Sequence, residues 1–399
     1  MSRKLVFLIP DGMGDSPLPD LDGRTPLEAA RTPNMDRLAS EATLGRCRTI
    51  PPGQPPGSDI ANMALLGFDP DAHHTGRGPI EAAAQGLEVV DEDLIYRLNL
   101  CRVSAFAPDG IMENHSGCHV DTEPARSFLD RLSRELDEEE LELAPGFQYR
   151  HLLVQRGGTA RPEAELAIRP PHDILGRDLG PDLEQYAKSP LLNGLVHTAA
   201  RMLHNDGELG ANAAWPWGQG PPLKLPSFRE TFGLSGAVIS AVDLIKGLGR
   251  SAGLELLHVP GATGGPDTDY RGKADAAREF LQRGDFLYLH LEGPDECSHA
   301  GSIEDKIRCI EDFDELILGD LLEWMRERDI CCMIACDHLT PIPLRTHAPD
   351  PVPFLFHDPS APGEGPERFS ESEAEKSGLF LEQGTDLLPW ILRRMEGKV

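Results

Sequence analysis

Short apolar runs that end in polar or glycine-rich turns recur along the chain, and segments with helical spacing separate them. The first run, Lys4–Ile9, is almost continuously apolar and stops at a Pro-Asp-Gly turn, which is typical of a strand buried on both faces. Runs of the same kind occupy Phe286–Leu291, Ile330–Ala335 and Pro353–Phe356. We therefore predict that these segments are strands of one buried sheet.

Helical patterns lie between these strands. Apolar residues recur every three or four positions in Thr25–Ala42, and Ser302–Arg328 has the length and pattern of a helix. Residues 236–261 are predicted to form a strand, a helix and a second strand in succession. This alternation predicts the α/β class, with a mainly parallel sheet sandwiched by helices.

The middle of the chain breaks the pattern. Between residues 72 and 222 the alternation is lost, and loops rich in glycine, proline and charge replace it. A chain of 399 residues is also too long for one ordinary core. We therefore expect a core domain formed by residues 1–71 and 223–399, with an inserted α+β cap domain at 72–222.

Composition narrows the class of partner. The formal net charge of −28 repels nucleic acid and anionic membrane surfaces, so neither is an expected partner, and an anionic substrate needs local cations or a metal. The eight cysteines form no CxxC pair, and no stretch approaches the ~20 apolar residues of a membrane span. These features predict a soluble cytoplasmic protein with free thiols, whose oligomeric state stays open.

Three predicted strands are followed by metal-ligand residue types. Asp11 follows the first strand, Asp295 and His299 follow the 286–291 strand, and Asp337 and His338 follow the 330–335 strand. Each histidine alone would most often be an ordinary capped or surface side chain. Carboxylates and imidazoles at three ends of one sheet together favour a site for Zn, Mn or a similar divalent ion.

Ser58 follows Gly57 in a stiff loop rich in proline, just before a predicted helix at Asp59–Leu66. Its hydroxyl could be the N-cap of that helix. It could instead be a nucleophile activated by a metal, because no serine protease-like spacing is present. The standard nucleotide-binding motifs are absent from the sequence. Both interpretations of Ser58 stay open on the local sequence.

Longer motifs carry a resemblance that runs nearly from end to end. The motifs are LIPDGMGD (8–15), GRTPLEAARTPNMDRLA (23–39), PPGSDIANMALLGFDP (55–70), TGRGPIEAAAQG (75–86), DECSHAG (295–301) and DHLTPIPLRTHAPDPVPF (337–354). With these motifs the sequence resembles the alkaline phosphatase superfamily and, within it, the archaeal-type cofactor-independent (2,3-bisphosphoglycerate-independent) phosphoglycerate mutases.

The resemblance implies a centre of two divalent metal ions, Mn, Zn or Co, and no requirement for 2,3-bisphosphoglycerate. Ser58 would attack the phosphate ester of a small phosphorylated metabolite, form a phosphoserine, and return the phosphoryl group to another hydroxyl of the same glycerate. The reaction would interconvert 3-phosphoglycerate and 2-phosphoglycerate, and the cap domain would exclude water. The implied ligands are Asp11, Ser58, Asp337 and His338 for one ion, and Asp295, His299 and His347 for the other.

The cationic groups expected around the substrate differ from the family pattern. Related mutases carry an arginine-rich stretch where this chain has residues 113–126, so the expected substrate-binding groups are Arg77, His115, His119 and Arg345. The same stretches resemble a sister branch proposed to contain functional analogues of homoserine kinase. The alternative is therefore a homoserine kinase-like phosphotransferase on the same metal site, and a non-catalytic metal-binding protein is a third, weaker interpretation.

Overall fold

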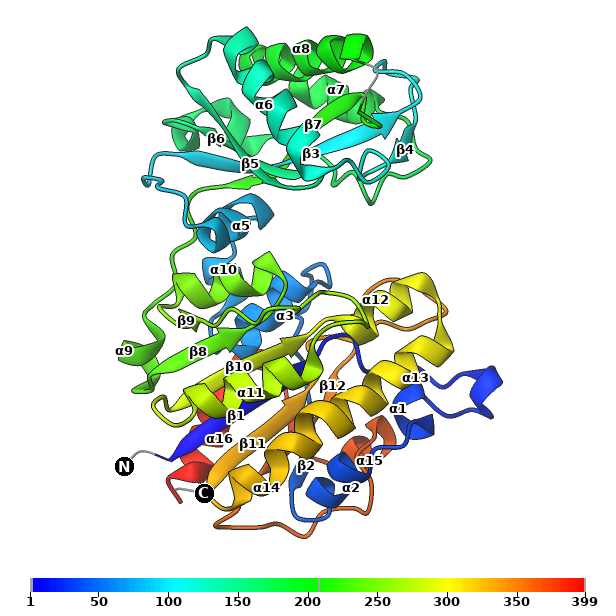
Figure 1. The fold of residues 1–399 in the computed structure, drawn as a ribbon, viewed down its shortest axis with the longest axis vertical. Helices are drawn as coiled ribbons and strands as arrows, with labels where there is room; N and C mark the ends of the chain where they lie inside the picture. Colours follow the sequence, from blue (N-terminus) through cyan, green and yellow to red (C-terminus); the bar gives the residue numbers. More distant parts are fainter. Residues whose placement is uncertain (1–2, 207–208, 398–399) are drawn as a thin grey trace. The chain divides into compact units, whose positions relative to one another are not determined.

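The computed structural model describes residues 3–206 and 209–397 (Figure 1). It divides into two compact units. Unit 1 comprises Met1–His74 and Lys224–Val399, and unit 2 comprises Thr75–Leu223. The outermost residues of the expected core domain, 1–2 and 398–399, lie outside the described residues.

Unit 1 is built on an eight-stranded sheet in the order β13-β2-β12-β11-β1-β10-β8-β9. Its described strands pair in parallel, except that β12 runs antiparallel to both of its neighbours. The prediction of a mainly parallel sheet is therefore confirmed. The strands are β1 (Lys4–Pro10), β2 (Thr43–Cys47), β8 (Gly236–Ile239), β9 (Glu255–Leu256), β10 (Phe286–Leu291), β11 (Ile330–Ala335), β12 (Val352–His357) and β13 (Phe380–Leu381).

The central strand β1 explains the first apolar run. It lies between β10 and β11, and Leu5 is in register with Phe286 on one side and Cys331 on the other. The side chains of β1 from Leu5 onward are fully buried, because helices cover both faces of the sheet. Since the three strands are parallel, the segments that follow them emerge at one edge.

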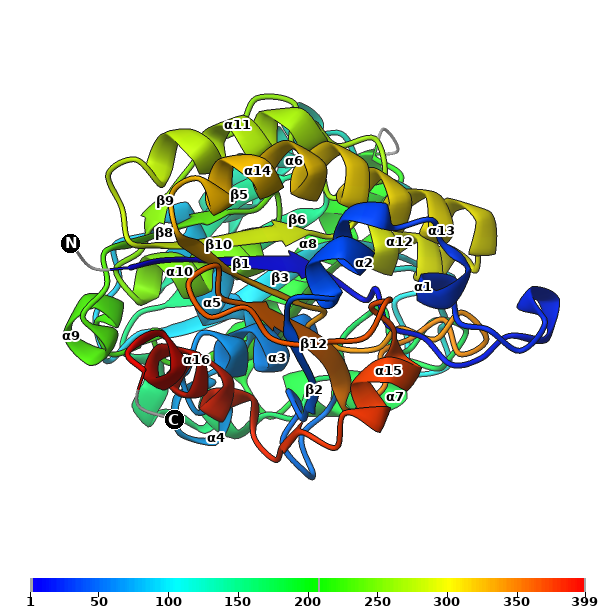
Figure 2. The ribbon, with the colours of Figure 1, turned by 90° about the horizontal axis from the view of Figure 1, so that it is seen from below.

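Helices cover both faces of this sheet, with α11, α13 and α14 along one face and α3, α10 and α16 along the other (Figure 2). Residues 303–326 are helical throughout, with a π-helical segment, η4, in the middle. The helices of unit 1 are α1 (Pro26–Ala29), α2 (Pro33–Ala39), α3 (Ser58–Leu65), α4 (Pro70–His73), α9 (Phe228–Phe232), α10 (Asp243–Ser251), α11 (Tyr270–Phe280), α12 (Gly293–Ala300), α13 (Ile303–Asp312), η4 (Phe313–Gly319), α14 (Asp320–Arg326), α15 (Glu371–Lys376) and α16 (Leu387–Met395), with 3-10 turns η1 (Pro19–Leu21) and η5 (Gly384–Asp386).

The expectation of one helix over Thr25–Ala42 is wrong. The segment forms two short helices, α1 and α2, with a break before Pro33. Proline disfavours helical backbone in the preceding residue, and Thr32 has φ −124° and ψ 60°. Thr25 caps α1 in a capping box with Glu28, so each helix begins at its own signal.

Unit 2 contains a five-stranded antiparallel sheet in which four strands follow the order β4-β3-β6-β5, and the fifth strand, β7, also pairs with β3. Its core includes the fully buried rings of Tyr96, Phe128 and Trp215. Its elements are α5 (Arg77–Gln85), β3 (Leu94–Val103), β4 (Met112–Asn114), α6 (Thr122–Leu136), β5 (Leu141–Phe147), β6 (Arg150–Gln155), η2 (Gly158–Ala160), η3 (Pro162–Glu165), α7 (Gly180–Tyr186), α8 (Pro190–Asp206) and β7 (Ala213–Gly220).

Two general features follow from the fold. The eight cysteines carry free thiols, and all but Cys118 are buried. Within the described ranges, no helix combines the length and the apolar character needed to cross a membrane.

Candidate metal centre

Asp11 begins the loop after β1 and is almost completely buried. Its Oδ2 lies 2.9 Å from Nε2 of His290, but its Oδ1 is buried without a hydrogen-bond partner. Burial, together with the neighbouring carboxylates of Asp337 and Asp295, raises the pKa of Asp11 well above its usual range. An unpartnered carboxylate oxygen among other carboxylates is the environment that a cation would stabilise.

Asp337 and His338 follow β11 and are fully buried. The Oδ1 of Asp337 accepts hydrogen bonds from the backbone N–H groups of Gly12 (3.2 Å) and His338 (2.9 Å). Burial acts to raise the pKa of the Asp337 carboxyl. The charge of His338 and hydrogen bonding act in the opposite direction and are stronger together, so the pKa of Asp337 lies below its usual value. The Nε2 of His338 lies 3.6 Å from the free Oδ1 of Asp11 and 3.5 Å from Oδ2 of Asp337.

Ser58 is the first residue of α3, and Gly57 occupies the N-cap position. The Ser58 side chain makes no capping hydrogen bond, so the N-cap interpretation is wrong. Its Oγ lies 3.1 Å from Nε2 of His338. One turn later, the Asn62 amide donates to the Ser58 carbonyl (2.8 Å) and to Oδ2 of Asp337 (2.7 Å), and thereby ties the start of α3 to the loop after β11.

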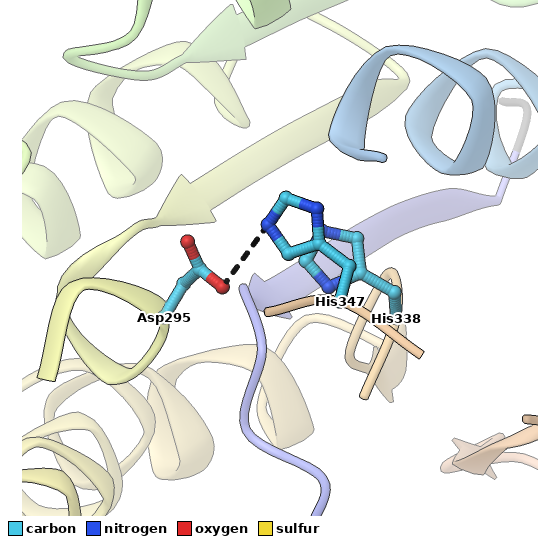
Figure 3. A group of neighbouring side chains, drawn as sticks. All are labelled: Asp295, His338 and His347. Carbon is cyan, nitrogen blue, oxygen red and sulfur yellow. Dashed lines mark ion pairs between the residues drawn. The ribbon is translucent and has the colours of Figure 1, made fainter. Parts of the chain in front are cut away.

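A second group of side chains surrounds Asp295. This residue lies in α12 one turn before His299, whose Nε2 is 3.2 Å from Oδ2 of Asp295. The Nε2 of His347 is 3.6 Å from Oδ1 of Asp295 and 3.1 Å from Nε2 of His299. Figure 3 shows the ring of His347 directed at Asp295 with His338 beside it, and the two ring centroids are 4.1 Å apart.

The charges of the second group reinforce one another. Burial raises the pKa of Asp295, but hydrogen bonds from His299 and His347 outweigh it and hold the pKa well below its usual range. The hydrogen bond to Asp295 in turn raises the pKa of His299 to about 9. Burial lowers the pKa of His338, which favours its neutral, ligating form.

The three histidines share one arrangement. In each, Nδ1 meets an oxygen of a residue that is not a candidate ligand, and Nε2 is directed toward the candidate ligands. A ligating histidine is usually oriented in this way, because the hydrogen bond at one ring nitrogen selects the tautomer that leaves the other free. The contacts are His299 Nδ1 to the Arg345 carbonyl (3.0 Å), His347 Nδ1 to the Pro56 carbonyl (3.4 Å) and His338 Nδ1 to Thr340 Oγ1 (3.1 Å).

The donor atoms therefore suit divalent ions. Two groups each offer ligand atoms that all lie within 4.8 Å of one another, namely Asp11, Asp337 and His338, and Asp295, His338 and His347. His338 belongs to both groups, so the two lie side by side. Carboxylate oxygen and imidazole nitrogen are ligands for Zn, Mn and Co, and the unpartnered Asp11 Oδ1 has the free lone pairs that such an ion requires.

Comparison with known proteins also indicates a metalloenzyme. Residues 3–387 match the model of the metalloenzyme superfamily. The chain is 40% identical to the 2,3-bisphosphoglycerate-independent phosphoglycerate mutase of Methanosarcina barkeri, with 98% of this chain and 99% of the relative covered. It is 43% identical to mutase 2 of this type from Methanothermobacter thermautotrophicus, with 89% of each covered. The chain belongs to the 2,3-bisphosphoglycerate-independent phosphoglycerate mutase family.

Solved structures support the same family. The cofactor-independent phosphoglycerate mutase of Thermoplasma acidophilum superposes with a TM-score of 0.65 at 25% identity, and the match covers 98% of this chain and 100% of the other. A protein from Pyrococcus horikoshii superposes with a TM-score of 0.81 at 29% identity, covering 100% of this chain and 98% of the other. The resemblance inferred from the motifs is thus confirmed, and the homoserine kinase-like alternative receives no support.

The family resemblance also suggested Arg77, His115, His119 and Arg345 as substrate-binding groups. Arg345 is exposed and contributes its backbone carbonyl to His299. Arg77, His115 and His119 belong to unit 2, where Arg77 begins α5, His115 is half-buried and His119 is exposed. Their role as substrate-binding groups stays a prediction.

Sequence reasoning missed Arg97, which lies in the middle of β3 and is almost completely buried. Its Nη1 is 2.8 Å from Oε1 of Glu81, its guanidinium stacks 5.1 Å from the ring of Trp217, and its Nε is buried without a partner. Burial, and then the positive charge of Arg150 and Arg77, lowers the pKa of Arg97. Arg77, Arg97 and Arg150 therefore form a group of positively charged side chains in unit 2.

Both Arg97 and His290 carry a signal that the sequence shows. Each is a polar residue inside a mostly apolar strand, in LIYRLNL and in FLYLHL. A buried polar side chain requires a partner, so such a position indicates a specific interaction. The neutral His290, whose pKa burial lowers to about 4, holds Oδ2 of Asp11 in place.

Proposed function

We propose that this protein is a cofactor-independent phosphoglycerate mutase that interconverts 3-phosphoglycerate and 2-phosphoglycerate through a phosphoserine at Ser58. Family membership at about 40% identity over the whole chain supports the reaction. The observation that carries the catalytic role is the position of the Ser58 Oγ, 3.1 Å from Nε2 of His338, the same nitrogen that lies 3.6 Å from Oδ1 of Asp11 and 3.5 Å from Oδ2 of Asp337. A serine with only a capping role would not be directed into that cluster.

The chain's own residues set up the transfer. Two divalent ions, Mn, Zn or Co, would lower the pKa of the Ser58 hydroxyl and stabilise the charge of the transferring phosphoryl group. The Ser58 hydroxyl loses its proton and its oxygen forms the bond to phosphorus, while the bond between phosphorus and the ester oxygen of the glycerate breaks and that oxygen takes up a proton. In the second transfer the other glycerate hydroxyl loses its proton and bonds to phosphorus, and the Ser58 oxygen leaves and is protonated again. The N-terminus of α3 favours the negative charge at Ser58. The proposed ligand sets are Asp11, Ser58, Asp337 and His338 (first set), and Asp295, His299 and His347 (second set).

We further propose that cationic side chains bind the carboxylate and phosphate of the substrate. In unit 2 these are Arg77, His115 and His119, to which we add Arg97, and in unit 1 the residue is Arg345. The support for Arg97 is its buried, unpartnered Nε, since a guanidinium fork fits a carboxylate or phosphate better than other side chains do. The overall negative charge supports the absence of nucleic acid and membrane partners, and the free cysteines support a cytoplasmic location.

Phosphorus NMR of the purified, metal-loaded protein tests this function. With 3-phosphoglycerate alone, the signal of 2-phosphoglycerate should grow to equilibrium without release of inorganic phosphate. A parallel sample with homoserine and ATP should show no phosphohomoserine. If a protein with both ions bound forms no 2-phosphoglycerate, the proposed reaction is wrong.

A further inference from the structure

Thr340 is a fully buried residue in the loop after β11, and its backbone is held on both sides. Its N–H donates to the carbonyl of Gly14 (3.2 Å), in the loop after β1. Its carbonyl accepts a hydrogen bond from the buried ammonium group of Lys306 (3.1 Å). These contacts fix the position of the hydroxyl, which lies between the two ligand sets.

The Thr340 hydroxyl contacts one member of each ligand set. Its Oγ1 is 2.6 Å from Oδ1 of Asp295, in the second set, and 3.1 Å from Nδ1 of His338, in the first set. An ionised carboxylate can only accept, so the hydroxyl hydrogen goes to Asp295. Oγ1 must then accept from the N–H at Nδ1 of His338, which leaves Nε2 of that ring as the lone-pair donor toward Ser58 and Asp11.

The two other histidines are oriented by backbone carbonyls instead, His299 by that of Arg345 and His347 by that of Pro56. Thr340 differs because a single side-chain atom orients two ligands at once. A threonine hydroxyl can also be removed by substitution, whereas a backbone carbonyl cannot.

Gly12 supports the same contact from the loop after β1. A Cβ at this position would lie 2.7 Å from Oγ1 of Thr340 and 2.8 Å from Oδ1 of Asp295, which is closer than real contacts allow. Gly12 also has φ +61°, a conformation that favours glycine. The absence of a side chain therefore keeps open the space in which the hydroxyl meets the carboxylate.

We propose that Thr340 is a positioning residue that couples the two ligand sets, so that loss of its hydroxyl weakens metal binding at both. The inference rests on the two-ion centre proposed above. Without the hydroxyl, Asp295 loses a hydrogen-bond donor and His338 loses the acceptor that selects its tautomer. Changes in such outer contacts of metal ligands typically cost about 10- to 100-fold in affinity.

The experiment measures metal affinity in variants that retain one ligand set at a time. Asp11→Asn disables the first set and His299→Gln disables the second, and Thr340→Val is introduced into each background. Calorimetric titration with Co²⁺ should show about tenfold or greater weakening of the remaining site in both backgrounds. Thr340→Ser, which keeps the hydroxyl, should retain the parent affinity and the parent cobalt absorption spectrum.

Thr49→Val is the matched control, because Thr49 is a buried threonine of unit 1 whose hydroxyl has no partner. It should leave both affinities unchanged. Thermal unfolding of the metal-free variants checks the fold, and Thr340→Ala replaces Thr340→Val if the latter does not fold. Weakening in only one background, or equal effects of the Val and Ser variants, overturns the inference. Failure of the unsubstituted protein to bind two ions instead contradicts the proposed centre.

Discussion

At the residue scale, the centre depends on side chains whose partners leave one atom free. The three histidines present Nε2 because Nδ1 is hydrogen-bonded elsewhere, and Asp11 presents Oδ1 because His290 holds Oδ2. Each proposed ligand is thereby oriented in the metal-free protein, which would reduce the entropy lost when an ion binds.

Ser58→Ala tests the nucleophile. Loss of the hydroxyl should reduce kcat for 3-phosphoglycerate by roughly a thousandfold or more, because the proposed reaction passes the phosphoryl group through the Ser58 oxygen. The measurement is coupled turnover together with metal content and thermal unfolding. Ser40→Ala, at an exposed serine that ends α2, should retain activity. A Ser58→Ala protein with full turnover contradicts covalent catalysis.

Arg97→Lys tests the cationic cluster of unit 2. Lysine keeps the charge but loses the guanidinium fork, so KM for 3-phosphoglycerate should rise about tenfold, while metal affinity stays the same. Arg102→Lys is the control on the same strand, because Arg102 is exposed and pairs with Glu113. If Arg97 serves only its ion pair with Glu81, the substitution lowers stability and leaves KM unchanged.

At the element scale, a buried ion pair holds the ligand-bearing loops together. The ammonium group of Lys306, on α13, is 2.8 Å from Oδ2 of Asp15 and also contacts the carbonyls of Gly14 and Thr340. Asp15 in turn accepts a hydrogen bond from the N–H of Ile342 (3.1 Å). The loops after β1 and β11 are therefore joined by one charged group beneath the centre.

Lys306→Met should remove this connection and leave the carboxylate of Asp15 buried without its counter-ion. Breaking such a pair typically destabilises a protein by about 3–5 kcal/mol. Urea unfolding of the metal-free protein measures the change. Arg308→Met, on the same helix but with an exposed partner at Glu304, should cost less than about 1 kcal/mol. Equal effects of the two substitutions would contradict the role of Lys306.

At the scale of the whole molecule, the stability of the fold should depend on pH through Glu371. Burial raises the pKa of this carboxyl, at the start of α15, to about 7. Its oxygens accept hydrogen bonds from the N–H of Asp15 (3.1 Å) and the hydroxyl of Thr25 (2.8 Å). Because the folded protein binds this proton more tightly than the unfolded chain does, the contribution is full below about pH 4.5 and is lost as the pH rises through about 7.

Glu371→Gln should remove that dependence, because the amide stays neutral and can still hydrogen-bond to both partners. At pH 8 the variant should be more stable than the parent by roughly 1–3 kcal/mol, since one pKa unit corresponds to about 1.4 kcal/mol. At pH 4.5 the difference should be small. Urea unfolding with chelator present measures both, and Glu375→Gln, on an exposed position of α15, is the control. A difference independent of pH would exclude this origin.

The central strands of the unit 1 sheet could be predicted from the sequence because buried parallel strands need continuous apolar runs. Predicted strands such as Ile330–Ala335 therefore match the observed ones closely. The break at Pro33 was missed because the apolar spacing continues across it, although proline alone signals a boundary. The roles of Arg97 and His290 were missed because the spacing of residues along one strand does not show which side chains of other segments contact them.

The sequence by itself determined the family and the kinds of ligand atom at three strand ends, because these depend on residue type and order. Only the tertiary structure decided that Asp11 has an unpartnered oxygen, that Ser58 is not an N-cap and that Thr340 contacts both ligand sets. These facts depend on distances between segments that are hundreds of residues apart in the chain. Such distances are set by packing of the whole sheet and its helices, which no local pattern encodes.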